Sequence, residues 1–316
     1  MGILIQEPGL FTTVQDEGRY GYQQFGVTPS GPMDARSFHI ANLLVGNDLG
    51  EGALEMTFQG PTMKFEEANV VAVTGADMKP TLNGKPVPMY EAFAVEKDDV
   101  LKFQFAMNGS RGYVAFAGGL DIPLLMESKS TLASKGLGGV DGRKLQKEDH
   151  IGFTAPKKEL PHMESRKVSK PEFPNKEVVL RVIRGPQDDC FSEEEIRRFF
   201  WYGFKVTNEF DRMGCRLERS EPVKHLQDGN IISDGIACGS IQVPTNGQPI
   251  IMLADRQTVG GYTKIGTVIS VDLSKLAQAK PGMDVRFVEV SLELAQDLYI
   301  RELEEMEQAD KLLNQA

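Results

Sequence analysis

Residues 69–87 read NVVAVTGADMKPTLNGKPV and carry two of the signals that decide the fold. The first six residues form a short apolar run rich in valine, which is typical of a buried β-strand. Further along, Asn83-Gly84 separates two short segments. A two-residue Asn-Gly loop favours a type I′ hairpin, because both of its central residues adopt positive φ. We therefore predict a strand over 69–74 and a hairpin centred on Asn83 and Gly84.

Similar short runs recur along the chain. They are rich in Val, Ile, Thr and Phe, are bounded by Gly, Pro, Asn and Asp, and cover residues 100–105, 112–116, 178–183, 249–254, 267–272 and 284–290. Many short strands separated by turn residues are typical of β-barrels or sandwiches. The predicted fold class is therefore mainly β.

Three segments have helical periodicity instead. The first covers residues 33–45 and ends at Gly46. The second begins at Ser192, where Glu195 three residues later completes a capping-box pattern. The third covers 292–313, where apolar residues recur every three to four positions among many acidic ones. Its apolar stripe must be covered, and the sequence leaves open whether its own domain or a partner covers it.

The length of 316 residues, with 41% hydrophobic and 25% charged residues, suits two globular domains. Prolines, lysines and glutamates interrupt residues 156–176, which we interpret as a linker. The predicted organisation is an N-terminal β-barrel domain over 1–155, the linker, a C-terminal β-barrel domain over 177–290 and a C-terminal helix over 291–316. We interpret the basic residues of the linker as solvated charges rather than an anion site; they are Lys157, Lys158, Arg166, Lys167 and Lys170.

Composition argues against several classes of partner. A formal net charge of -10 and a pI of about 5.1 would repel nucleic acids, whose phosphates attract Lys and Arg. No apolar run is long enough to span a membrane. Three cysteines are too few for a disulfide framework, so we expect free thiols in a reducing compartment. We expect a soluble cytoplasmic protein that binds neither nucleic acid nor membranes.

Familiar chemical motifs are missing from the sequence. It holds no phosphate loop of the G-x-x-x-x-G-K-[ST] type, no C-x-x-C and no H-E-x-x-H, so we expect no metal site. No G-x-S-x-G elbow supports a serine nucleophile, although a Ser or Cys that meets a His only in space stays open.

The first candidate site lies in residues 9–34, where glycines and prolines fix a backbone that also carries polar side chains. Glycine permits close backbone approach, and a helix entrance at 30–34 would aim N–H groups at an anionic or carbonyl oxygen. We predict catalytic roles for Asp16 and Arg19, and substrate-binding roles for Gln15, Ser30, Gly31 and Asp34. The alternative is that Asp16 and Arg19 form a structural ion pair and the glycines serve turns.

The second candidate site lies in residues 231–266, where polar groups cluster after an apolar run. An amide or carboxylate substrate needs donors such as a guanidinium and side-chain amides, and a carboxylate can orient the guanidinium or move a proton. We predict catalytic roles for Asp255 and Arg256, and substrate-binding roles for Gln242, Gln257, Thr258 and Lys264. A purely structural Asp-Arg pair at a strand end is the alternative.

Several long motifs occur in a recognisable order: TVQDEGR at 13–19, SGPMD at 30–34, ANLLVGN at 41–47, TGAD at 74–77 and ADRQTVGGY at 254–262. Together they resemble the biotin-dependent carboxyltransferase family, which includes allophanate hydrolase subunit 2 and KipA-like proteins. The resemblance implies two cyclophilin-like β-barrel domains with a few helices.

Free-standing members of this length resemble the 5-oxoprolinase C subunit. This resemblance implies an ATP-dependent complex, with KipI-like (B) and LamB/YcsF-like (A) subunits, that opens 5-oxo-L-proline to L-glutamate. The cofactor is then ATP, bound through an unfamiliar loop, at an interface within the complex or on a partner. The chain lacks the Met-Lys-Met typical of a biotin attachment site, so we do not expect it to carry biotin.

Two alternative functions follow from the same resemblance. One is a regulatory protein that antagonises a KipI-type inhibitor of a histidine kinase. The other is a carboxyltransferase component that acts on urea-like amides with biotin supplied in trans.

Overall fold

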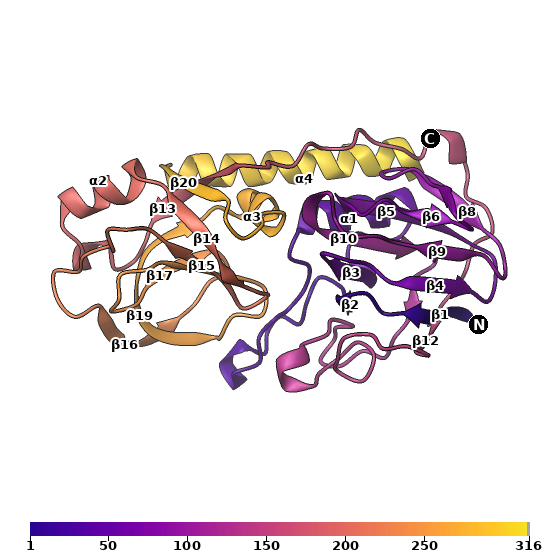
Figure 1. Cartoon of the computed structure of the whole chain (residues 1–316), viewed down its shortest axis with the longest axis horizontal. Coiled ribbons are helices and arrows are strands. Elements are labelled where there is room, and N and C mark those ends of the chain that lie inside the picture. Colours follow the sequence, from indigo (N-terminus) through magenta and orange to yellow (C-terminus); the bar gives the residue numbers. More distant parts are fainter. Residues whose placement is uncertain (315–316) are drawn as a thin grey trace. The chain divides into compact units, whose positions relative to one another are not determined.

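The computed structural model describes residues 1–314, and the chain is mainly β with a few helices (Figure 1). It divides into two compact units. The first unit contains Met1–Arg19, Ser30–Phe173 and the described residues from Leu303 onward, and the second contains Tyr20–Pro29 and Pro174–Glu302. The predicted domain boundaries stay predictions, and each unit is described by itself below.

The first unit is built from two sheets. The seven-stranded sheet has the order β11 (Leu120–Asp121), β12 (His150–Phe153), β1 (Gly2–Glu7), β4 (Thr62–Phe65), β9 (Val100–Lys102), β6 (Thr81–Leu82) and β7 (Lys85–Pro86). The five-stranded sheet has the order β2 (Phe11–Gln15), β3 (Ala53–Thr57), β10 (Asn108–Phe116), β5 (Asn69–Asp77) and β8 (Ala92–Val95). The chain also forms short 3-10 helices: η1 (Gln23–Phe25), η2 (Ala133–Lys135), η3 (Met163–Ser165) and η4 (Asp188–Cys190). Of these, η2 and η3 lie in the first unit, and η1 and η4 lie in the second.

The five-stranded sheet of the first unit is buried on both faces, and β10 shows why. Val114 and Phe116 join a core cluster that also takes side chains from the seven-stranded sheet, whereas Tyr113 and Ala115 join a second cluster under helix α1 (Ala35–Leu44). Successive side chains of a strand point to opposite faces, so one strand serves both clusters.

The second cluster also receives Met306 and Leu313 of helix α4 (Leu292–Asn314), which confirms the helix predicted for 292–313. The apolar stripe of this helix is therefore covered by its own chain at these two positions. Contact between the rest of the helix and a partner stays a prediction.

The second unit is a closed β-barrel. The strand order is β13 (Glu177–Arg184), β20 (Asp284–Glu289), β14 (Phe204–Phe210), β15 (Gly214–Glu218), β18 (Ile250–Met252), β17 (Ser240–Val243) and β19 (Val259–Val268). An additional pairing of β13 with β19 closes the ring, and β16 (Asn230–Gly235) pairs with the first part of β19, at residues 259–262. Helices α2 (Glu193–Trp201) and α3 (Ser270–Ala277) and the part of α4 up to Glu302 also belong to this unit (Figure 1). The predicted fold class is confirmed.

The most local predictions agree with the structure. Asn83 and Gly84 have φ of 51° and 79° between the paired strands β6 and β7, as a type I′ hairpin requires. Ser192 accepts a hydrogen bond from the Glu195 N–H at 3.1 Å and caps α2. Both features depend on residues that are neighbours in the sequence.

The strand predicted over 267–272 is wrong in its second half. Strand β19 ends at Val268 and helix α3 begins at Ser270. Asp272, in the first turn of α3, accepts hydrogen bonds from the Arg181 N–H at 2.8 Å and from its guanidinium at 2.9 and 2.6 Å. This contact with β13 fixes the helix start and is invisible in the local pattern.

The interpretation of residue 166 as a solvated charge is also wrong. Arg166 is buried, and its guanidinium donates to the carbonyl oxygens of Pro161 at 2.9 Å and of Leu44 at 3.2 Å. Leu44 is the last residue of α1, so Arg166 satisfies a carbonyl that the helix leaves unpaired. The other four basic residues named for the segment are exposed: Lys157, Lys158, Lys167 and Lys170.

Candidate functional site

In the first unit, the Asp16 carboxylate lies buried at the centre of a hydrogen-bond network. Oδ1 accepts from the Gly18 N–H at 2.9 Å and from the hydroxyls of Ser128 and Ser130 at 2.6 Å each. Oδ2 accepts from the Lys129 N–H at 2.5 Å. Three of these donors bind Oδ1 and one binds Oδ2, and together they tie the glycine-rich N-terminal segment to the 128–130 loop.

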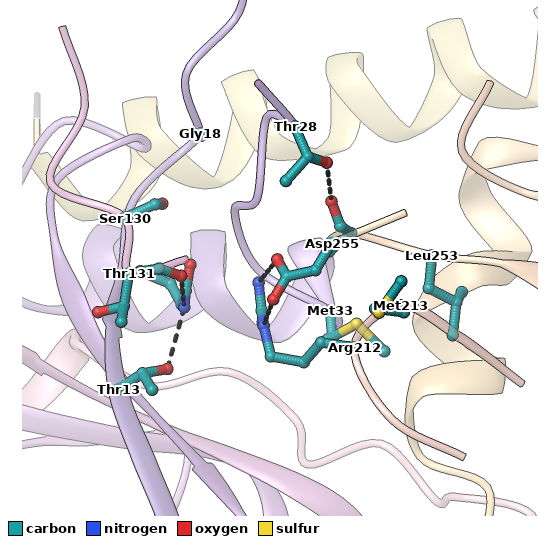
Figure 2. Close-up of polar contacts among 12 residues, drawn as sticks. Thr13, Gly18, Thr28, Met33, Ser130, Thr131, Arg212, Met213, Leu253 and Asp255 are labelled. Atoms are coloured by element: carbon teal, nitrogen blue, oxygen red, sulfur yellow. Dashed lines mark hydrogen bonds and ion pairs between the residues drawn. The ribbon is translucent and has the colours of Figure 1, made fainter. Parts of the chain in front are cut away.

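Arg19 and Gln15 connect the same two segments. The Arg19 guanidinium is fully buried and donates to the Ser130 carbonyl oxygen at 2.5 Å. The side-chain amide of Gln15 donates to Thr13 Oγ1 at 2.9 Å and to the Thr131 carbonyl oxygen at 3.1 Å, two of the dashed lines in Figure 2. These contacts hold the predicted site residues in place.

Asp34 is the N-cap of α1. Its carboxylate accepts from the Ser37 N–H at 3.0 Å and from the Ser37 hydroxyl at 2.7 Å, and its own N–H donates to the Tyr113 hydroxyl at 2.8 Å. Tyr113 donates in turn to Glu55 Oε2 at 2.7 Å. Burial raises the pKa of Tyr113 well above its ordinary value, and the charges of Glu55 and Asp34 raise it further, so Tyr113 stays a donor.

The helix entrance therefore differs from the expected open anion site. The Ser37 N–H is directed at the Asp34 carboxylate of the same helix, and the Met33 N–H donates to Glu55 Oε2 at 2.8 Å. Ser30 is buried in the left-handed region with φ of 59°, and Gly31 has φ of 90°. The substrate-binding roles of Ser30, Gly31 and Asp34 stay predictions.

In the second unit, Asp255 forms a buried bidentate ion pair with Arg212 (Figure 2). Arg212 Nε lies 2.9 Å from Asp255 Oδ2, and Nη2 lies 2.9 Å from Oδ1. The Asp255 N–H also donates to the Arg212 carbonyl oxygen at 2.8 Å. The guanidinium predicted from the sequence to lie beside Asp255 is that of Arg256, and this pairing is wrong.

Arg256 and Thr258 instead bind the chain around Ile236. The Arg256 guanidinium donates to the carbonyl oxygens of Ile236 at 3.0 Å and Leu253 at 3.3 Å. The Thr258 carbonyl oxygen accepts from the Ile236 N–H at 3.0 Å. Both residues thus anchor the end of β16.

Lys264 is an almost fully buried cation, with 3% of its surface exposed. Its ammonium donates to Asp234 Oδ2 at 2.6 Å and to the Gly235 carbonyl oxygen at 3.0 Å. The hydrogen bond from Lys264 lowers the pKa of Asp234 below its ordinary value. The positive charge predicted for a ligand is thus matched by an acid on β16.

The second unit also has a pocket of about 420 Å³. It is lined from β14, β15, β17, β18 and β19 and the segments beside them, by Asn208, Glu209, Phe210, Asp211, Met213, Gly214, Arg216, Gln242, Ile250, Met252, Gln257 and Tyr262. Its volume lies in the range of roughly 300–1,000 Å³ that is typical of small-molecule sites. Of the predicted site residues, the structure brings Gln242 and Gln257 together here.

Gln242 is the most deeply buried polar residue of this lining, with 1% of its surface exposed. It lies on β17, opposite Ile250 on β18. Within residues 1–314, its side-chain Nε2 has no hydrogen-bond acceptor. On the pocket wall Arg216 Nε pairs with Glu209 Oε2 at 2.8 Å.

Sequence reasoning missed the two groups that complete these clusters. Arg212 lies in the turn between β14 and β15, within the motif Asp211-Arg212-Met213-Gly214, whose polar and glycine residues signal only a turn. Ser128 and Ser130 lie in the Gly- and Ser-rich loop that follows β11. In the part of the chain that the structure describes, no group of three or more His, Cys, Asp or Glu side chains is placed to hold a metal ion. No helix within residues 1–314 is long and apolar enough to cross a membrane.

The sequence matches the family described as carboxyltransferase domain, subdomain A and B, over residues 25–289. The chain belongs to this family. The resemblance found in the sequence motifs is therefore confirmed.

Two bacterial relatives match this carboxyltransferase-family chain over nearly their whole length. It is 36% identical to the 5-oxoprolinase C subunit of Escherichia coli (strain K12) over 287 residues, which cover 91% of each chain. It is 34% identical to the 5-oxoprolinase C subunit of Haemophilus influenzae over 288 residues, or 90% of each chain.

Larger proteins contain a similar region. Urea amidolyase of Lachancea kluyveri is 33% identical over 93% of this chain, but that match covers only 17% of the relative. The crystal structure of Kluyveromyces lactis urea carboxylase superposes with a TM-score of 0.90 at 30% identity and covers 98% of this chain and 29% of that one. This carboxyltransferase-family chain thus corresponds to a minor part of these enzymes.

Proposed function

We propose that the chain is the C subunit of an ATP-dependent 5-oxoprolinase, which opens 5-oxo-L-proline to L-glutamate. The observation that carries the proposal is the match in length: two relatives named as the C subunit of 5-oxoprolinase are covered to 91% and 90%. The match to urea amidolyase covers only 17% of that relative, so the other 83% has no counterpart here.

The chemistry explains why such a reaction needs ATP. A five-membered lactam is a stable amide whose carbonyl carbon is a weak electrophile. Transfer of the γ-phosphoryl group to the carbonyl oxygen makes that oxygen a leaving group. One water adds to the carbon, the ring C–N bond breaks and the nitrogen takes a proton, which gives γ-glutamyl phosphate. A second water then hydrolyses this acyl phosphate, and glutamate, ADP and phosphate result.

The pocket of the second unit does not fit the triphosphate of ATP. Its charged side chains are two acids, Glu209 and Asp211, and one base, Arg216, which is little positive charge for a triphosphate. Phosphates are bound by excess positive charge and by exposed backbone N–H groups. We therefore propose that ATP binds outside this pocket, on or beside a partner protein, and that biotin takes no part.

The proposed partners are the KipI-like (B) and LamB/YcsF-like (A) subunits, in the cytoplasm. A surface suited to one of them lies on the N-terminal part of α4, where Leu292, Tyr299 and Ile300 are exposed on one side of the helix. Exposed apolar side chains that cluster on one element commonly mark protein contacts.

The experiment is glutamate release from 5-oxo-L-proline and ATP by the three purified subunits, with each omitted in turn. We expect release to require this chain. Unchanged release without it would contradict the proposal, and a folded complex that releases no glutamate would favour the regulatory role instead.

A second candidate is a carboxyltransferase component that acts on urea-like amides with biotin supplied in trans. The structural similarity to urea carboxylase of Kluyveromyces lactis favours it. Carboxylation of urea by this chain together with a biotin carboxylase and a biotinylated carrier, blocked by avidin, would support this function over the first.

A further inference from the structure

The pocket of the second unit combines a cavity with a buried donor that no protein group satisfies. Gln242 has 1% of its surface exposed, and its Nε2 has no acceptor among the described residues. A buried donor left without an acceptor loses its hydrogen bonds to water and gains none in return, so most such groups have a partner. Gln242 also lines the pocket, so a ligand bound there can supply an acceptor.

We propose that this pocket binds a small cyclic amide whose carbonyl oxygen accepts a hydrogen bond from Gln242 Nε2. The identification of the ligand as 5-oxo-L-proline rests on the proposed function. A lactam is locked in the cis form, so its C=O and N–H lie on the same edge. The carboxamide of Gln242 presents a donor and an acceptor on one edge too, and the two edges are complementary.

The remaining walls suit the other parts of such a ligand. Phe210, Ile250 and Met252 offer apolar surface to the ring methylenes. Arg216 offers a guanidinium to a carboxylate. Its present partner Glu209 is 75% exposed and Arg216 is 48% exposed. Exposed pairs of this kind contribute little to stability, so a ligand carboxylate can replace Glu209.

Gly260 provides the space in which the Gln242 amide lies. A Cβ atom at this position would come within 2.8 Å of Gln242 Nε2 and 2.7 Å of Ile236 Cδ1. Real Cβ atoms do not approach so closely, so a larger residue must displace the amide. Gly260→Ala therefore perturbs the proposed donor without removing it.

The test is binding to the purified full chain, measured by calorimetry with three probes. They are 5-oxo-L-proline, 2-pyrrolidinone, which keeps the lactam but lacks the carboxylate, and L-proline, which keeps the carboxylate but lacks the lactam. We expect 5-oxo-L-proline to bind tightest and L-proline to bind more weakly by about ten-fold or more, the effect of one lost buried hydrogen bond. We expect 2-pyrrolidinone to bind between them.

Variants identify the donor. Gln242→Leu should weaken 5-oxo-L-proline binding about ten-fold, as loss of a buried hydrogen bond predicts. Gly260→Ala should weaken it in the same direction, which keeps the test valid if Gln242→Leu fails to fold. Gln296→Leu, on the exposed surface of α4, is the matched control and should bind like the wild type.

Two results would overturn the proposal: equal binding of L-proline and 5-oxo-L-proline, or unchanged binding by folded Gln242→Leu and Gly260→Ala. Absence of binding by all three probes would overturn it as well. Because the assay contains neither ATP nor partners, glutamate release by the complex without binding here would reject the pocket and keep the proposed function. Lactam binding to this pocket without glutamate release by the complex would keep the pocket and reject the proposed function.

Discussion

Asp16 in the first unit and Asp255 in the second are both buried carboxylates in predicted site segments, but they are satisfied by different means. Asp16 accepts from two hydroxyls and two backbone N–H groups, which are neutral donors. Asp255 accepts from one guanidinium through two parallel bonds. The buried charge of Asp16 is thus stabilised by several residues, whereas the buried charge of Asp255 is stabilised by Arg212. Loss of a single partner should therefore affect the two regions unequally.

The largest effect is expected for Arg212→Met. Removal of one member of a buried ion pair leaves the other charge buried and unpaired, which costs about 3–5 kcal/mol. The free energy of unfolding, measured by urea denaturation, should fall by that amount. Arg286→Met, which removes an exposed pair with Glu177, is the matched control and should change stability by at most about 1 kcal/mol.

A double variant sharpens this prediction. Arg212→Met combined with Asp255→Leu should regain most of the lost stability, because apolar residues can replace a buried ion pair at little cost. If the double variant is stable but the assembled complex loses glutamate release, the predicted catalytic role of Asp255 gains support. If Arg212→Met alone lowers the free energy of unfolding by less than about 1 kcal/mol, Arg212 is not the main stabilising partner of Asp255.

A smaller effect is expected for Ser130→Ala. This change removes one of the four donors to Asp16, and the other three remain. A hydrogen bond to a charged group contributes about 1.5–3 kcal/mol, so the loss should lie at or below that range. Ser220→Ala, at an exposed position, serves as the control. If Ser130→Ala lowers the free energy of unfolding as much as Arg212→Met does, the three remaining donors do not stabilise the Asp16 charge as we infer.

The smallest effect is expected at acid pH, from a third buried carboxylate. Burial alone raises the pKa of Asp272, but hydrogen bonds from Arg181 and Lys275 outweigh burial and hold the pKa below its ordinary value of 3.8. A carboxyl group with a lowered pKa stabilises the fold above its unfolded pKa, and this stabilisation is lost as the pH falls through the folded pKa.

The free energy of unfolding of Asp272→Asn should therefore fall less steeply than that of the wild type as the pH drops below about 4, where the carboxyl group of the unfolded chain titrates. Asp284→Asn, which removes an exposed pair with Lys205, is the control and should keep the acid dependence of the wild type. Unfolding free energies measured from about pH 7 to about pH 2 provide the test. Identical acid dependence of Asp272→Asn and the wild type would contradict the pairing.

Features that depend on neighbouring residues could be predicted from the sequence. The Asn83-Gly84 hairpin and the Ser192 cap each need only a few adjacent residues. The helix after β19 was missed because Asp272 finds its partner on β13, 91 positions away in the chain. Arg212 was missed because it meets Asp255 only after the barrel brings together residues 43 positions apart.

The pocket shows the same limit. Gln242 and Gln257 were predicted as substrate-binding residues from their place near a strand end, but the other lining residues come from strands that the barrel brings together. The motifs identified the family, because motifs and their order can be read directly from the sequence. They did not show that Gln242 Nε2 would lack a hydrogen-bond partner among the described residues.

The most direct test is the KM for 5-oxo-L-proline of the assembled three-subunit complex that contains Gln242→Leu in place of the wild-type chain. We predict glutamate release that depends on this chain, with KM raised about ten-fold by the loss of one buried hydrogen bond. Glutamate release with an unchanged KM from the folded, assembled variant would contradict this prediction.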